Sequence, residues 1–221
     1  MQRLRVSFSR GEEVKFISHL DIMRFWERAF RRSEIPVAYS EGFTPHPRIS
    51  IAAPLAVGVT SEAELMDVWL KRWMPPQSFM MRTKGQLTQG FDVIGVREVG
   101  LNIPSLQSCI AFAEYNVEAR SEKSEQDIYA SICSLLQAGE LPWHHLRNDK
   151  MHFYDLRALI DDLWIVGCHD FLYVLGMRLH CNTKGSGRPE QVVSALGFPE
   201  YPESIHRTGL FLKGMLPHSL I

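Results

Sequence analysis

The sequence lacks the clustered cysteines of a metal or redox centre. Its cysteines stand alone, at positions 109, 133, 168 and 181. No two of them have the short spacing of a zinc knuckle or a redox dithiol, and no cluster suits an iron–sulfur centre. Scattered cysteines are typical of a reducing compartment. We therefore expect no metal and no cofactor in this polypeptide, and a cytoplasmic location.

Long apolar runs and an excess of one charge are also missing. No stretch approaches the roughly 20 apolar residues of a membrane helix, and the first residues are too short an apolar run for a signal peptide. The 24 Lys and Arg residues balance 25 Asp and Glu residues, so no global basic field indicates a nucleic-acid partner. No G-x-S-x-G nucleophile motif is present. We predict a soluble protein without a membrane or DNA partner.

What the sequence does contain is enough apolar material for two domains. It has 221 residues, of which 45% are hydrophobic. The apolar periodicities of residues 1–103 predict strands near 4–8, 48–53, 63–70 and 91–99, and helices at 18–35 and 75–87. Those of residues 104–221 predict strands near 107–119, 153–160, 172–180 and 207–213, and helices at 125–137 and 189–196. This order, β-α-β-β-α-β twice, predicts an α+β protein of two tandem ferredoxin-like domains.

The first candidate site lies at the predicted start of a helix. Ser18 is a typical N-cap residue, and Asp21 stands three positions later, as in a capping box. His19 and Asp21 together suit general acid/base chemistry, or a grip on a phosphate at the helix N-terminus. The alternative is structural, with Ser18 and Asp21 capping the helix and His19 exposed in its first turn.

The second candidate is the segment Tyr39–Arg48, which brings together glycine, aromatic, histidine and proline residues. Prolines on both sides of His46 restrict the backbone and preset the direction of the imidazole. Phe43 offers a ring on which a nucleobase can stack. The alternative is an ordinary rigid connection between strands, with Phe43 buried.

Two further groups of basic residues are candidates for phosphate contacts. Arg24, Arg28 and Arg31 share one face of the predicted helix, although a solvated helix face explains the same pattern. A glycine-rich run precedes the last helix, where Lys184 and Arg188 add charge. Its spacing matches neither a Walker loop nor a dinucleotide fingerprint, and a flexible turn is the alternative. The adjacent aspartates at 161 and 162 indicate a turn after a strand.

These segments resemble the radical-SAM-linked protein family, a bacterial family of unknown function. The resemblance rests on F-I-S-H-L-D at 16–21, Y-S-E-G-F-T-P-H-P-R at 39–48, G-S-G-R-P at 185–189 and I-H-R-T-G-L at 205–210. It adds Arg207 to the candidate binding residues. It also implies that members of the family occur together with a B12-binding radical SAM enzyme and an RNase E/G-type ribonuclease. Because this chain has no cysteine cluster for the radical SAM centre, it would act as a substrate presenter or partner of such an enzyme.

The leading hypothesis is therefore an accessory RNA-binding or substrate-presenting protein that serves RNA or ribosome modification. The candidate contacts to tRNA, rRNA or a partner are Arg24, Arg28, Arg31, Phe43, Arg48, Lys184, Arg188 and Arg207. One alternative is a metal-independent endoribonuclease in which His19, Asp21 and His46 are catalytic and Arg48 stabilises the phosphorane. It requires both imidazoles to reach one phosphate, within roughly 7 Å of each other. The other alternative is a protein-interaction adaptor without RNA contact.

Overall fold

The computed structural model describes residues 1–147, 150–182 and 185–214, with only the backbone of 145–147 and 150. The chain divides into two compact units, Met1–Ile110 and Ala111–Ile221. The domain boundary expected from the sequence lies earlier, after residue 103. The segment beyond it belongs to unit 1 because the Gln107 side-chain amide donates a hydrogen bond to the Ile51 carbonyl at 3.0 Å.

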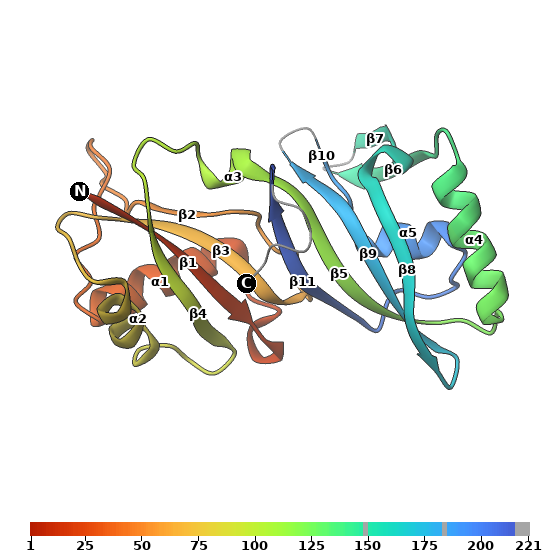
Figure 1. Ribbon diagram of the computed structural model, residues 1–221, viewed down its shortest axis with the longest axis horizontal. Coiled ribbons are helices and arrows are strands. Elements are labelled where there is room, and N and C mark those ends of the chain that lie inside the picture. Colours follow the sequence, from red (N-terminus) through yellow and green to blue (C-terminus); the bar gives the residue numbers. More distant parts are fainter. Residues whose placement is uncertain (148–149, 183–184, 215–221) are drawn as a thin grey trace. The chain divides into compact units, whose positions relative to one another are not determined.

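Unit 1 is a four-stranded sheet with helices on one face. Its main elements are β1 (Gln2–Arg10), α1 (His19–Arg32), β2 (Ile49–Ile51), β3 (Thr60–Leu70), α2 (Pro76–Lys84) and β4 (Phe91–Val99), with the 3-10 turn η1 (Glu12–Val14) after β1 and the short α3 (Leu106–Cys109) at the end. The strand order is β2-β3-β1-β4, and each neighbouring pair is antiparallel. Figure 1 shows β1 between β3 and β4.

The core of unit 1 lies between this sheet and its helices. Leu4, Val6 and Phe8 alternate along β1 and are buried, as their spacing predicts. Trp26 of α1 is fully buried, with its ring centroid 5.0 Å from that of Phe8. The apolar stripe predicted for this helix is confirmed, since α1 buries positions 22, 26, 29 and 30.

The other face of β1 carries charged side chains that are also buried. Arg3 and Arg5 are only 2% and 5% exposed. Both guanidinium groups bind the carboxylate of Asp67 on β3, with the closest contacts at 2.6 and 2.9 Å. Arg3 also donates to the carbonyls of Ile103 and Pro104. A buried carboxylate and two backbone carbonyls thus offset the desolvation of these arginines.

Unit 2 repeats the same arrangement with an insertion. Its elements are β5 (Ile110–Arg120), α4 (Glu125–Gln137), β6 (Pro142–Arg147), β7 (Lys150–Asp155), the 3-10 turn η2 (Arg157–Leu159), β8 (Ile160–His169), β9 (Leu172–Asn182), β10 (Gly185–Ser186), α5 (Pro189–Ala195) and β11 (Ser204–Leu212). The main strands lie in the order β8-β9-β5-β11, and β6 and β7 form a separate hairpin. The five helices α1 to α5 of the described residues thus belong to a mixed α/β fold.

The strand predicted at 153–160 is wrong in position. Residues 150–155 belong to the inserted hairpin, and the sheet strand β8 begins at Ile160. Asp161 and Asp162 are consequently within a strand rather than a turn. Both lie beside the guanidinium of Arg178 on β9, the second at 3.6 Å. Ion pairs with Arg178 across the two strands therefore stabilise the aspartates within β8.

Two features are absent from the described residues. No helix among them is both long and apolar enough to cross a membrane. Within the same residues, no three or more His, Cys, Asp and Glu side chains gather in an arrangement that would hold a metal ion.

Candidate functional site

A buried arginine organises the turn that leads into α1. Arg10, at the end of β1, is 1% exposed. Its guanidinium donates to the carbonyls of Lys15 at 2.6 Å and Ile17 at 2.8 Å, and also to those of Val14 and Leu55. Because one rigid cation binds backbone groups from two separate loops, the direction of both loops is fixed.

This turn presents exposed apolar side chains. Phe16 and Leu20 are 73% and 68% exposed, and Val57, from the adjoining loop, is 59% exposed. The two segments lie together, since the Gly58 amide donates to the Lys15 carbonyl at 2.8 Å. We name Phe16, Leu20 and Val57 the α1-start surface.

His19 and Asp21 lie beside this surface, at the helix start predicted from the sequence. The Ser18 hydroxyl accepts a hydrogen bond from the Asp21 amide, which confirms Ser18 as the N-cap. The same hydroxyl donates to the Asp21 carboxylate at 2.7 Å, and Arg24 binds the second carboxylate oxygen at 3.2 Å. The hydrogen bond from Ser18 lowers the pKa of Asp21, and Arg24 lowers it further. Asp21 therefore holds a helix cap, and His19 is exposed next to it.

The segment Tyr39–Arg48 forms a closed loop with a fixed base. The Arg48 amide donates to the Ala38 carbonyl, and the Ser40 amide to the His46 carbonyl, both at 2.8 Å. The His46 amide binds the Ser40 hydroxyl at 3.0 Å. Gly42, at the tip, has a φ of +127°, which favours glycine. Phe43 follows it and is fully exposed, so the alternative of a buried Phe43 is wrong.

The structure places His19 and His46 at opposite ends of the unit 1 sheet. The start of α1 is bound to Arg10, at the last residue of β1. The loop with His46 adjoins the other end, where Val37 pairs with Leu70 and Leu70 pairs with Gln2. Nine residues of β1 separate these ends, which corresponds to about 27–30 Å. An acid/base pair sharing one phosphate needs about 7 Å or less, so the two histidines do not form one site.

Arg48 instead joins an aromatic and basic group on the sheet edge. Its guanidinium lies 5.1 Å from the ring centroid of Trp69, and that of buried Arg3 lies 4.9 Å from the same ring. The ammonium group of Lys71 lies 5.2 Å from the ring of Tyr39. Such cation–π contacts hold the rings and the charges together. We name this set, with the neighbouring loop residues, the loop surface: Tyr39, Phe43, His46, Arg48, Trp69 and Lys71.

A cavity of about 330 Å³ opens beside the loop surface. Its apolar lining comes from Phe30, Ile35, Val37 and Ile49. Its polar lining comes from Glu27, Arg31, Tyr39 and Lys71. An apolar hollow with a few polar groups is the usual form of a small-ligand subsite, and its Tyr39 and Lys71 also belong to the loop surface.

Arg24, Arg28 and Arg31 of α1 are exposed, as predicted, but two of them form salt bridges. Arg24 pairs with Asp21 at 3.2 Å and Arg31 with Glu27 at 3.1 Å. Exposed pairs of this kind contribute about 0–1 kcal/mol and exchange readily for other anions. Arg31 is also part of the cavity lining. Arg31 is thus an available charge next to the loop surface, whereas Arg24 lies near the start of α1, at the other end of the sheet.

The described candidate residues of unit 2, Arg188 and Arg207, do not gather into a site. Lys184 lies outside the described residues. The glycines beside it serve packing, because a side chain at Gly187 would meet the Leu179 Cβ at 2.9 Å and one at Gly185 would meet Leu159, also at 2.9 Å. Arg188 is exposed at the start of α5.

Arg207, expected at a binding surface, is buried at 2% exposure, with its guanidinium 5.6 Å from the Tyr115 ring. A buried guanidinium over a ring is a packing arrangement, so we remove Arg207 from the surface contacts.

Arg10, Trp69 and Lys71 were not among the candidate residues predicted from the sequence. Trp69 follows Asp67 two positions later on β3, while Met66 and Val68 point into the core. This period of two was visible in the sequence and assigns Trp69 to the face opposite the helices. Lys71 follows the end of β3 and lines the cavity together with residues of α1. Arg10 gave no signal, because only the fold brings the carbonyls of two loops to its guanidinium.

Comparison with known proteins assigns the family. The model of a bacterial family, described as "uncharacterized protein conserved in bacteria" (DUF2344), matches residues 3–189. The chain belongs to this family. The family description names no reaction and no partner. Among curated proteins, nothing matches this chain.

Solved structures show a related fold at very low sequence identity. A Cbf5-Nop10-Gar1 complex matches 93% of this chain and 48% of its own chain, with a TM-score of 0.51 and 7% identity. An H/ACA RNP bound to a substrate RNA gives a TM-score of 0.48 at 7% identity, with 93% and 46% coverage. An archaeal box H/ACA sRNP Nop10-Cbf5 complex gives 0.47 at 9% identity, with 92% and 46% coverage. The chain thus spans about half the length of the chains it matches, and the likeness concerns the fold alone.

Proposed function

We propose that the loop surface of unit 1 binds single-stranded RNA. The observation that carries this proposal is the alternation of rings and cations at one sheet edge, with Arg48 over Trp69 and Lys71 over Tyr39. Proteins that bind single strands combine aromatic platforms for bases with cations along the phosphate backbone. Both parts are present here within one unit.

The geometry of the loop supports a base-stacking role for Phe43. A fully exposed phenyl ring is costly in water, and here it stands at the tip of a loop whose base is fixed by backbone hydrogen bonds. The cavity of about 330 Å³, lined in part by Tyr39 and Lys71 of the loop surface, offers space for a base turned out of the strand. His46 and Arg48 on the same loop then lie near the sugar-phosphate backbone.

Fluorescence anisotropy with a labelled single-stranded RNA of about 12 nucleotides tests the proposal, measured between 50 and 200 mM salt. For the unmodified chain we expect log K to fall with log salt, because phosphate contacts release counterions. Arg48→Gln and Lys71→Gln should each weaken binding and reduce the slope by about 0.7. Arg82→Gln is the matched control, since Arg82 is an exposed cation of α2 outside the loop surface. Equal effects of all three variants would overturn the proposal.

A second function is favoured by the α1-start surface, which we propose as the docking site for a protein partner. Three exposed apolar residues on loops fixed by a buried arginine form a surface prepared for contact. The partner implied by the sequence resemblance is a radical SAM enzyme, to which the chain would present RNA. Phe16→Ser with Val57→Ser should abolish co-purification of that enzyme and leave RNA affinity unchanged. Loss of RNA binding in this double variant would argue against separate surfaces.

We further propose that both units are ferredoxin-like domains. Each has the order β-α-β-β-α-β when the β6–β7 hairpin is set aside. In each, the fourth strand lies next to the first, then the third, then the second, as β4-β1-β3-β2 and β11-β5-β9-β8. An experimental structure of either unit with a different strand order would refute this assignment.

A further inference from the structure

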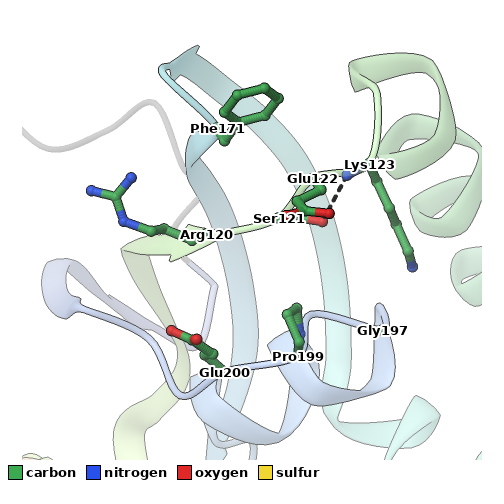
Figure 2. Close-up of a pocket in the computed structure, with 8 residues that line it drawn as sticks. All are labelled: Arg120, Ser121, Glu122, Lys123, Phe171, Gly197, Pro199 and Glu200. Atoms are coloured by element: carbon green, nitrogen blue, oxygen red, sulfur yellow. Dashed lines mark hydrogen bonds between the residues drawn. The ribbon is translucent and has the colours of Figure 1, made fainter.

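Unit 2 contains a cavity that no part of the proposed function uses. It has a volume of about 750 Å³ and lies where the end of β5 meets the β8–β9 turn and the segment after α5. Figure 2 shows Phe171 and Pro199 on opposite sides of the segment that follows β5. Its lining residues are Arg120, Ser121, Glu122, Lys123, Phe171, Gly197, Pro199 and Glu200.

The ring of Phe171 is held at this cavity by a strained backbone. Asp170 and Phe171 have φ angles of +48° and +63°, and the pair His169 and Leu172 closes them into a two-residue hairpin turn. This turn type favours glycine or asparagine, and a bulky residue in the left-handed region costs of order 1–3 kcal/mol. Yet the side chain is 63% exposed, so core packing does not repay the strain.

Hydrogen bonds from the neighbouring segment fix the strained turn. The Ser121 amide donates to the Phe171 carbonyl at 3.0 Å, and the Arg120 guanidinium donates to the Asp170 carbonyl at 3.3 Å. The Tyr173 hydroxyl donates to the Lys123 carbonyl at 2.7 Å. The backbone that carries the ring is therefore fixed before any ligand arrives, which lowers the cost of ordering this segment on binding.

The charged side chains that line the cavity favour a neutral aromatic ring over a phosphate. Arg120 is engaged in a salt bridge with Glu203, and the Lys123 ammonium group donates to the Leu196 carbonyl at 3.2 Å. The carboxylates of Glu122 and Glu200 remain as hydrogen-bond acceptors in the lining. A dianionic phosphate would face these carboxylates, whereas an amino group on an aromatic ring would donate to them.

We propose that this cavity binds a nucleobase that carries an exocyclic amino group, stacked on Phe171. Adenine, cytosine and guanine have such a group, and uracil does not. The base belongs either to an RNA strand or to a free nucleoside, since the recognised chemistry is the same. The site is separate from the loop surface, and its occupation does not depend on RNA binding there.

NMR titration of the full-length chain with adenosine, cytidine, uridine and adenosine 5′-monophosphate tests the proposal. Adenosine and cytidine should shift the amide resonances of Ser121 and Phe171, and uridine should bind at least about 5-fold more weakly. The monophosphate should bind no more tightly than adenosine. Binding of the monophosphate more than about 10-fold tighter than adenosine, or equal binding of uridine, would overturn the proposal.

Phe171→Gly separates the role of the ring from that of the fold. It should weaken adenosine binding at least about 5-fold, because stacking on the ring is lost. It should not lower the melting temperature, because glycine removes the backbone strain. Phe171→Tyr should retain binding, and Arg48→Gln on the loop surface should leave it unchanged. Unaltered adenosine binding in Phe171→Gly would overturn the proposal.

The source of the base is settled by a third titration, with the labelled RNA used for the loop surface. If the base comes from RNA, Phe171→Gly weakens RNA binding as well as adenosine binding. If it comes from a free nucleoside, RNA binding is unchanged and only adenosine binding is lost. The absence of any nucleoside binding together with unaltered RNA affinity in Phe171→Gly would refute both sources.

Discussion

The two ends of the unit 1 sheet present exposed rings by different means. At the α1-start surface, the buried guanidinium of Arg10 binds carbonyls of two loops, so that Phe16 is displayed on a rigid support. At the loop surface, backbone hydrogen bonds fix only the base, and Phe43 stands on a tip with open space around Gly42. The first suits a flat, preformed partner surface. The second suits a ligand that adapts to the ring, such as a single strand.

Removing Arg10 should have the largest effect of the changes that we predict, because it removes the support of the α1-start surface and lowers stability. Arg10→Met keeps much of the buried volume but leaves the carbonyls of Lys15 and Ile17 without their donor. Loss of a buried charged donor to several acceptors costs about 3 kcal/mol or more. Urea unfolding should show a corresponding fall in the midpoint, whereas Arg82→Met on exposed α2 should change it little. An Arg10→Met midpoint equal to that of the control would show that the support is not the guanidinium.

Phe43→Ala, at the loop surface, should have the opposite effect: it should lower RNA affinity and leave stability unchanged. The fully exposed ring makes no contribution to the core, so the unfolding midpoint should not change. RNA affinity should fall by about 1–3 kcal/mol, the value of one stacked base. Anisotropy measured beside urea unfolding checks both parts. A loss of stability without a loss of affinity would place Phe43 in the fold rather than in the interface.

Much of the fold could be predicted from periodicity, because local patterns dictate local structure. Ser18 as N-cap, the stripe of α1 and the strand at 91–99 depend on residues close together in the sequence. The inserted β6–β7 hairpin was missed because residues 143–166, which run from β6 into β8, contain no glycine or proline to mark where one strand ends and the next begins. Nothing local distinguishes which of these strands joins the sheet.

The candidate site was harder to predict, because its residues meet only through strand pairing. The segment Tyr39–Arg48 was identified from its composition, but its neighbours Trp69 and Lys71 come from the end of β3 and the residue after it, more than twenty positions later. The endoribonuclease alternative required His19 and His46 to converge, and they lie at opposite ends of the unit 1 sheet. Whether two motifs meet in space depends on the fold, which neither motif determines by itself.

The smallest effect that we predict concerns the N-terminal cap of α1. Low pH should reduce the stability that this cap contributes and leave the loop surface unaffected. The pKa of Asp21 lies below its usual value of 3.8, chiefly because of the hydrogen bond from Ser18. The folded state therefore holds the carboxylate more strongly than the unfolded state, and this stabilisation is present above about pH 4 and is lost as the pH falls through the lowered pKa. Asp21→Asn removes the titrating group. The difference in melting temperature between the unmodified chain and Asp21→Asn should shrink between about pH 5 and pH 2, whereas the shift of RNA affinity caused by Phe43→Ala should be the same in both. A difference that stays constant with pH would show that Asp21 acts through its shape and not through its charge.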